Sequence, residues 1–151
     1  MRKPEQRMWD YLKDQMGRSW HAQRHEDKYC PDIPDISYGY AGMDGWLELK
    51  VLDGWPADPA KPISMPHLRS GQVNWLEDRY KHGNYSTNML VAVGGRDGTF
   101  GDAEWFVVPG NHVRDIYEKK MTEASIRARY LVYRGRDGGL KKLLDLVLGP
   151  S

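Results

Sequence analysis

The chain reads PDISYGYAGMDGWLELKV from Pro34 to Val51, and this stretch decides the fold. Residues 35–40 have the composition of a strand, and the glycine-rich residues 41–45 predict a hairpin connection. Residues 46–52 then predict a second strand, in which apolar and polar side chains alternate. We therefore expect a β-hairpin in the first third of the chain.

Alternation sorts the side chains of the second strand onto two faces. Its leucine and valine side chains fall on one face, which indicates a buried apolar layer, and Trp46, Glu48 and Lys50 fall on the other. Antiparallel pairing across the hairpin would bring Asp35 opposite or diagonal to Glu48. Two carboxylates and one ammonium group are thus expected to converge on neighbouring strands.

Two carboxylates and a lysine in this arrangement favour the binding of a divalent cation. Two close carboxylates repel each other, and a hard divalent cation such as Mg²⁺ relieves that repulsion because it prefers oxygen ligands. An adjacent lysine can orient or deprotonate a water molecule, or neutralise charge that develops on a phosphate. The pattern therefore outlines metal-assisted hydrolysis of phosphodiester bonds.

The segments on either side of the hairpin predict a mixed α/β fold, with a central mixed β-sheet flanked by helices. The polar stretch 19–28 is ambiguous, and a second short helix is one interpretation of it. We expect one domain over residues 1–151, with a basic C-terminal extension over about 110–151. Helices are predicted over residues 4–16, 68–82, 112–121 and 140–148, and strands over 89–93, 105–108 and 128–133.

Composition excludes several classes of protein. The chain has 151 residues, is 40% hydrophobic and 28% charged, and contains no apolar run near the roughly 20 residues that a membrane span needs. Its single cysteine, Cys30, excludes intramolecular disulfides and multi-cysteine zinc sites. The charged and polar start of the chain has no apolar segment typical of a secretory signal, so we expect a cytoplasmic location.

The hairpin and its surroundings resemble the PD-(D/E)xK nuclease superfamily. The match consists of Pro34-Asp35 and, after the hairpin connection, Glu48-Leu49-Lys50, with Arg24-His25-Glu26 upstream and Gln72 on a downstream helix. The sequence looks particularly like small phage-borne members, similar in kind to VRR-NUC-type nucleases and phage Holliday-junction resolvases. The resemblance covers residues 24–76, about a third of the chain, and implies a restriction-endonuclease-like core.

The resemblance also implies roles for individual residues. Asp35 and Glu48 would be metal ligands together with the backbone carbonyl of Leu49, and Lys50 would be the catalytic lysine. Glu26 matches an acidic residue that members often carry on the preceding helix, where it serves a second metal position or a metal-bound water. Gln72 matches a helical glutamine beside the site. A second Pro-Asp pair stands three residues earlier, so Asp32 is the alternative to Asp35.

The function implied is a Mg²⁺-dependent DNA endonuclease, with Mn²⁺ able to substitute. Because the sequence contains no recognisable helix-turn-helix or zinc finger, cleavage directed by DNA structure is favoured, with four-way (Holliday) junction resolution in phage DNA processing as the leading hypothesis. Cutting two strands favours a symmetric homodimer, which would work in the host cytoplasm if the chain is phage-encoded. The alternatives are a nuclease that acts on ordinary duplex DNA by nicking, degradation or restriction, and a non-catalytic nucleic-acid-binding module.

Basic residues outside the motif suggest contacts with the DNA backbone. The acidic centre, with 6 basic and 11 acidic residues over 29–113, is followed by a segment with 9 basic and 4 acidic residues over 114–142. Such cations contribute salt-dependent affinity and little sequence selectivity, although a solvated strand edge explains the same pattern. The candidate DNA-binding residues are Arg24, His25, Arg127, Arg129, Arg134, Arg136, Lys141 and Lys142.

Overall fold

The computed structural model describes residues 4–26, 29–83, 86–95 and 99–149. Its described strands form one six-stranded sheet in the order β1-β2-β3-β4-β5-β6. Only β3 and β4 run parallel, and the other neighbouring pairs are antiparallel. The strands are β1 (Trp20–Arg24), β2 (Ile36–Tyr40), β3 (Met43–Leu52), β4 (Thr87–Val93), β5 (Glu104–Pro109) and β6 (Tyr133–Arg134).

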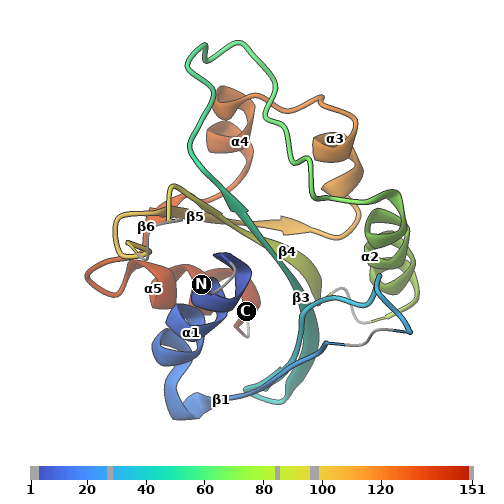
Figure 1. The fold of residues 1–151 in the computed structure, drawn as a ribbon. Coiled ribbons are helices and arrows are strands. Elements are labelled where there is room, and N and C mark those ends of the chain that lie inside the picture. The colour runs from blue at the N-terminus through green and yellow to red at the C-terminus, as the bar shows by residue number, and fades with distance from the viewer. Residues whose placement is uncertain (1–3, 27–28, 84–85, 96–98, 150–151) are drawn as a thin grey trace.

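Helices cover both faces of this curved sheet (Figure 1). On one face, α1 and α5 enclose a core that includes Leu47, Leu49 and Trp105. On the other face, α2, α3 and α4 pack over Met89 and Phe106. The helices are α1 (Pro4–Met16), α2 (Ser70–His82), α3 (Val113–Tyr117), α4 (Glu123–Arg129) and α5 (Gly139–Leu148), and the short 3₁₀ turn η1 (Gly17–Ser19) follows α1.

The sequence of β4 reflects its place between the two cores. All seven of its residues are buried, and from Met89 to Val93 successive side chains enter opposite cores. A strand covered on both faces is expected to be continuously apolar rather than alternating. The parallel step from β3 to β4 passes through α2, which places the N-terminus of that helix beside the end of β3. This mixed sheet, flanked by helices, confirms the predicted fold class.

Two predicted elements are corrected by the structure. The interpretation of residues 19–28 as a helix is wrong over Trp20–Arg24, which forms the edge strand β1 and pairs with β2; residues 27 and 28 lie outside the described residues. The burial of β1 alternates, with Trp20 buried against Tyr38 and Tyr40, so its outer side chains are polar. A polar edge strand five residues long carries too little apolar periodicity to be distinguished from a helix.

The predicted strand 128–133 is also wrong over most of its length. Residues up to Arg129 belong to α4, which begins at the cap residue Thr122 and buries Ile126. Thr122 and Ser125 form a reciprocal cap at the start of this helix, which favours helix over the alternating pattern that follows. Only Tyr133–Arg134 forms a strand, and the helix predicted over 112–121 is the shorter α3. None of the described helices is long and apolar enough to cross a membrane.

Candidate active site

The turn of the hairpin fixes the register of the two motif strands. Ala41 and Gly42 connect β2 to β3 and have φ values of 52° and 83°. Positive φ at both central residues is the geometry of the two-residue turn that suits the right-handed twist of paired strands. The resulting register pairs Ile36 with Leu47, so the next position along the hairpin sets Asp35 opposite Glu48.

Asp35 immediately precedes β2, and beyond it β3 continues without β2 as a partner on that side. Its Oδ2 accepts a hydrogen bond from the backbone N–H of Leu49, at 2.8 Å. The N–H and C=O groups of one strand residue point toward the same neighbouring strand. The carbonyl of Leu49 is therefore directed to the side of β3 on which Asp35 lies, and it can add a third oxygen to those of Asp35 and Glu48.

The two carboxyl groups are coupled to each other. Glu48 is 2% exposed, and burial followed by the negative charge of Asp35 raises its pKa well above the ordinary value. Burial also raises the pKa of Asp35, although the hydrogen bonds from Leu49 and from Glu48 oppose that shift. The direction of both shifts follows from placing two acids in a poorly hydrated site. Each carboxyl group therefore favours its protonated form more strongly than it would in water, and a positive charge between them would favour ionisation.

Lys50 and Gln72 complete a buried network around Glu48. The amide of Gln72 donates to Glu48 Oε2 at 3.1 Å, and its oxygen accepts from Lys50 Nζ at 3.3 Å. Lys50 Nζ also donates to the backbone carbonyl of His67 at 3.1 Å and lies 3.9 Å from Glu48 Oε2. Because Lys50 and Gln72 are 7% and 6% exposed, both side chains are held in defined positions.

Gln72 is itself fixed by the start of α2. Its side-chain oxygen accepts a hydrogen bond from the backbone N–H of Arg69, the cap residue of the helix, at 3.0 Å. The oxygen thus satisfies one of the N–H groups that a helix leaves without an internal partner. The position that sequence reasoning assigned to Gln72, on a helix beside the motif strands, is the position that the structure gives it.

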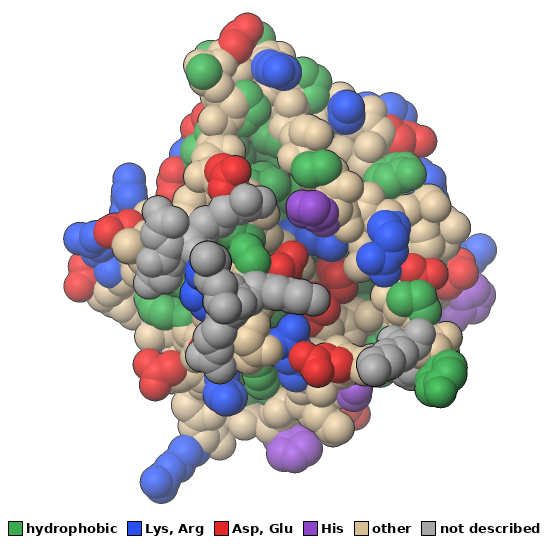
Figure 2. All heavy atoms as spheres, in the orientation of Figure 1, with side chains coloured by type: hydrophobic (Ala, Val, Ile, Leu, Met, Phe, Trp, Pro, Cys, Tyr) green, Lys and Arg blue, Asp and Glu red, His purple; other side chains and the backbone are tan. Residues whose placement is uncertain are grey.

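These groups open into a cavity of about 650 Å³. Figure 2 shows acidic side chains gathered in a hollow near the middle of one face, with basic side chains around them. Arg24 and Arg69 contribute the guanidinium groups of the lining. A smaller cavity of about 200 Å³ shares Lys50 and His67 with the first, which extends the hollow along the end of β3. The remaining lining residues of the larger cavity are Pro4, Glu5, Asp35, Glu48, Leu49, Lys50, Val51, His67 and Gln72.

Glu5 lines both cavities and was missed by sequence reasoning. It lies in the first turn of α1, where an acidic residue is common because it complements the helix dipole, so its type alone is no signal. Glu26, the residue predicted on a preceding helix, instead follows β1. Its side chain is 74% exposed, forms an ion pair with Arg24 at 3.6 Å and does not line the cavity.

The alternative ligand Asp32 is outside the cavity lining. Its carboxylate is 43% exposed and lies 3.4 Å from the guanidinium of Arg69. Asp35 lines the cavity and Asp32 does not, so the geometry favours Asp35.

His25, a candidate for DNA contact, hydrogen-bonds Ser37 at 2.7 Å and donates its backbone N–H to the carbonyl of Asp35. It therefore lies beside the carboxylates.

The C-terminal basic candidates lie outside the cavity lining and contact groups elsewhere in the chain. Arg127 pairs with both Glu104 and Glu123 at 2.8 Å, and Arg129 lies 3.5 Å from Asp115. Arg136 pairs with Asp102, whose carbonyl accepts from Arg134. Lys142 lies 5.9 Å from the ring centroid of Tyr133, and Lys141 is exposed on α5.

The donor set at the centre of the site suits a hard cation. Among the described residues, no three histidine, cysteine, aspartate or glutamate side chains are grouped closely enough to hold a metal ion. Two carboxylates, a backbone carbonyl and solvent can satisfy Mg²⁺, which commonly keeps several waters and uses one or two carboxylates. A positive charge between Asp35 and Glu48 would relieve the repulsion that contributes to the raised pKa of Glu48.

The chain is similar to known proteins only among solved structures. No family model matches the sequence, and no curated protein matches it. The chain is similar to Hjc, a Holliday junction resolvase from the archaeal hyperthermophile Archaeoglobus fulgidus, at 16% sequence identity. The superposition covers 80% of this chain and 87% of the other, with a TM-score of 0.48.

Proposed function

We propose that this chain is a metal-dependent DNA endonuclease that selects branched DNA, with four-way junctions as its foremost substrate. The observation that carries the proposal is the buried network of Asp35, Glu48, Lys50 and Gln72, which opens into a cavity lined by arginines. Paired carboxylates beside an ordered lysine are suited to phosphodiester hydrolysis. Buried charged groups of this kind are not expected in a pocket that binds an apolar ligand.

Asp35, Glu48 and the carbonyl of Leu49 would hold Mg²⁺, with Mn²⁺ as a substitute of similar ligand preference. A cation bound there would supply positive charge to the scissile phosphate and lower the pKa of a coordinated water. Binding of such a cation would favour the ionised form of both carboxyl groups, because metal ligands must be deprotonated.

The chain's own residues orient and neutralise the phosphate. Lys50, held by Gln72 and by the carbonyl of His67, directs its ammonium group into the cavity from beside Glu48. A fixed cation at this point stabilises charge that develops on the phosphate without reorganising during the reaction. Arg24 and Arg69 line the same cavity and would contact the adjoining phosphates.

The proposal of a junction substrate rests on the sequence resemblance and on the absence from the sequence of a recognisable module for reading base order. Two such sites related by a twofold axis would cut two strands of a symmetric junction, so a homodimer is the expected working form. A role in phage DNA processing belongs to the same proposal.

The test is cleavage of a labelled four-way junction and its matched linear duplex, with Mg²⁺ or with EDTA. We expect Mg²⁺-dependent, symmetric cuts in the junction, and a loss of at least about a thousandfold in folded Asp35→Asn and Lys50→Ala variants. Asp32→Asn is the matched control, because it changes a neighbouring Pro-Asp pair that is absent from the cavity lining. It should cut as the unmodified chain does.

The other outcomes distinguish the alternatives. Equal cutting of junction and duplex would leave the catalytic residues in place and refute the junction preference. No cutting of either DNA by folded protein, with Mg²⁺ or Mn²⁺, would refute the nuclease and favour a binding module. Activity lost in Asp32→Asn but kept in Asp35→Asn would show that Asp32, and not Asp35, is the metal ligand.

A further inference from the structure

A row of flat side chains lies beside the carboxylates and has no part in the proposed hydrolysis. The ring centroids of His25 and Trp46 are 5.4 Å apart, and those of Trp46 and Trp75 are 5.2 Å apart. The guanidinium of Arg79 lies 4.9 Å from the Trp75 centroid and 5.6 Å from that of Trp46. We call these four residues, from β3, α2 and the end of β1, the aromatic shelf.

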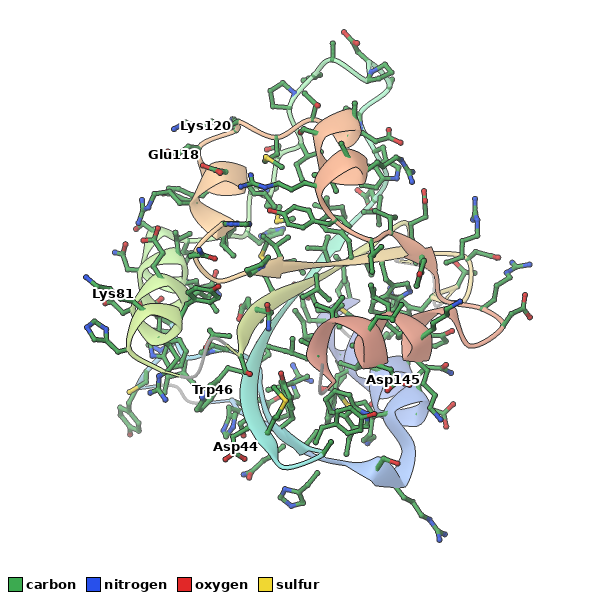
Figure 3. All side chains as sticks on the ribbon, turned by 180° about the vertical axis from the view of Figure 1, so that it is seen from behind. Asp44, Trp46, Lys81, Glu118, Lys120 and Asp145 are labelled. Carbon is green, nitrogen blue, oxygen red and sulfur yellow. The ribbon has the colours of Figure 1, made fainter. Side chains whose placement is uncertain are left out.

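The shelf is accessible to solvent. Its three rings are partly exposed and Arg79 is exposed, whereas Trp105 and Phe106 in the two cores are fully buried. Figure 3 shows Trp46 at the side of the sheet next to α2. The imidazole of His25 is held at one end of the row by its hydrogen bond with Ser37. The shelf is therefore a fixed, partly exposed aromatic surface at the edge of the second core, against which Trp75 packs.

The distance from the shelf to the carboxylates is about one nucleotide. Trp46 and Glu48 lie on the same face of β3, and two residues of a strand span about 7 Å. On β2, Ser37 pairs with Trp46, and Asp35 lies two residues before it on the same face. A DNA strand whose phosphate lies at Asp35 and Glu48 can thus place the base of an adjoining nucleotide over Trp46.

A small hollow beside Trp46 offers groups for the edge of such a base. It has a volume of about 270 Å³, and Gln23, Ser37 and Asp44 are among its lining residues. The carboxylate of Asp44 would repel a phosphate but can accept hydrogen bonds from the amino groups of a base. The cations of the larger cavity and the rings of the shelf thus divide the surface into a phosphate part and a base part.

We propose that the aromatic shelf stacks one unpaired nucleobase next to the phosphate that is cut. This inference rests on the proposed nuclease and narrows its substrate, because a base inside a duplex is already stacked on both faces and cannot lie on Trp46. The preferred DNA therefore carries at least one unstacked nucleotide at the branch point, as in a fork, a flap or an opened junction.

The experiment measures binding and stacking without cleavage. A splayed-arm DNA fork carries 2-aminopurine at the first unpaired nucleotide, and its emission and affinity are measured in EDTA beside those of a fully paired duplex. We expect the unmodified chain to quench the 2-aminopurine and to prefer the fork over the duplex. Trp46→Leu should abolish the quenching and lower fork affinity about tenfold or more, with duplex affinity changed less than twofold.

Further variants separate stacking from a structural role. Trp46→Phe keeps a ring and should restore most of the quenching, and Arg79→Met should weaken fork binding in the same direction. Tyr117→Leu is the control, because it removes a partly exposed ring from α3, outside the shelf. Ratios of fork to duplex affinity are compared, so a fraction of unfolded protein cannot imitate the effect.

The inference and the proposed function fail separately. Equal quenching by the Trp46→Leu and Tyr117→Leu variants, or equal affinity of the unmodified chain for fork and duplex, would overturn the shelf even if junctions are cut with Mg²⁺. Quenching that depends on Trp46 in a protein that cuts no DNA would support the shelf and leave a nucleic-acid-binding module as the function.

Discussion

The ionisation of Glu48 makes the stability of the folded chain depend on pH. Burial and the neighbouring Asp35 raise its pKa above the ordinary value of 4.5. Between that value and the raised folded-state pKa, the folded chain therefore holds a proton that the unfolded chain has released. Stability contributed by this proton is complete at low pH and is lost as the pH rises through the folded-state pKa of Glu48.

We therefore predict that Glu48→Gln stabilises the metal-free protein. The amide can donate to Asp35 and accept from Gln72 at every pH, so the variant should gain about 2–4 °C in Tm at pH 8, the shift that roughly 1 kcal/mol produces at this size. Thermal unfolding in EDTA between pH 5 and 9 measures the difference. The gain should shrink toward pH 5, and an equal Tm for both proteins at every pH would contradict it.

Mg²⁺ should make the Tm of the unmodified chain higher than the Tm of Glu48→Gln. A cation that binds only the folded state adds stability as its concentration rises above the dissociation constant. The unmodified chain should therefore gain Tm with Mg²⁺ at pH 8, whereas Glu48→Gln, which has lost a charged ligand, should gain little. A similar rise in both proteins would place the cation elsewhere.

Gln72 acts through the groups that it positions. It hydrogen-bonds Glu48, Lys50 and the N–H of Arg69, all from a buried amide. We expect Gln72→Met, which keeps the volume and removes the hydrogen bonds, to lower junction cleavage about 10–100-fold, as is common for partners of metal ligands. The Mg²⁺ dependence of the rate provides the diagnostic measurement, since a misplaced Glu48 should raise the concentration needed for half-maximal cleavage. Gln15→Ala on α1 serves as the control.

At the scale of elements, the hairpin turn determines whether Asp35 faces Glu48. Ala41 has a φ of 52°, a conformation that asparagine and glycine adopt at lower cost than alanine. We predict that Ala41→Asn stabilises the fold by about 0.5–1 kcal/mol and that Gly42→Ala destabilises it by about 1 kcal/mol. Urea unfolding measures both changes, and a stabilised Gly42→Ala variant would refute the turn geometry.

The contact of α4 with the loop after β3 is a second feature to test at this scale. Arg127 binds Glu104 and Glu123, lies over Trp55 at 5.0 Å, and has its pKa raised by the hydrogen bonds to these carboxylates. We predict that Arg127→Met costs about 1 kcal/mol of stability and changes DNA affinity less than twofold. Titration of labelled fork DNA checks the second part, and a loss of tenfold or more would support the DNA contact predicted for Arg127.

The elements best predicted from sequence were those with a strong periodic or turn signal. The helix over residues 4–16 and the hairpin that leads into β3 have nearly the bounds expected. The edge strand β1 and the short α4 were missed because tertiary pairing and a local cap, rather than apolar periodicity, define them. Short elements contain too few residues for a period to be read.

The site was predictable where neighbours in sequence are neighbours in space. Asp35, Glu48 and Lys50 belong to one hairpin, so strand alternation and the register set by a short turn bring them together. Glu5 reaches the cavity from a helix whose position depends on the packing of the core, which sequence spacing does not encode. The helix predicted around Glu26 was wrong because the polar edge strand β1 was interpreted as a helix.

At the scale of the whole molecule, the position of the site follows from the two-sided sheet. β3 lies between the hairpin partner β2 and the parallel strand β4, and its apolar side chains enter the core under α1. Its acidic and basic side chains point to the opposite face, where α2 begins and supplies Gln72. The same crossover that closes the sheet therefore completes the candidate catalytic network.

If the network acts as the proposed nuclease site, each copy cuts one strand at a time, and cutting two strands of a junction within one encounter needs two copies of the chain. We predict that a homodimer converts a cruciform-bearing supercoiled plasmid mainly to the linear form, because two sites related by a twofold axis act within one encounter. Adding an excess of Asp35→Asn chains, allowed to exchange subunits, should divert the product to nicked circles. Each mixed dimer would retain one working site.

Gel quantification of linear and nicked DNA over time, beside sedimentation of the free protein, checks this prediction. Asp32→Asn in the same excess is the matched control and should leave linear plasmid as the main product. Nicked circles that accumulate and are cut again only slowly by the unmodified chain would indicate a protein that acts as a monomer. That result would leave the site intact and remove the symmetry argument, since independent monomers cut the second strand only in a separate encounter.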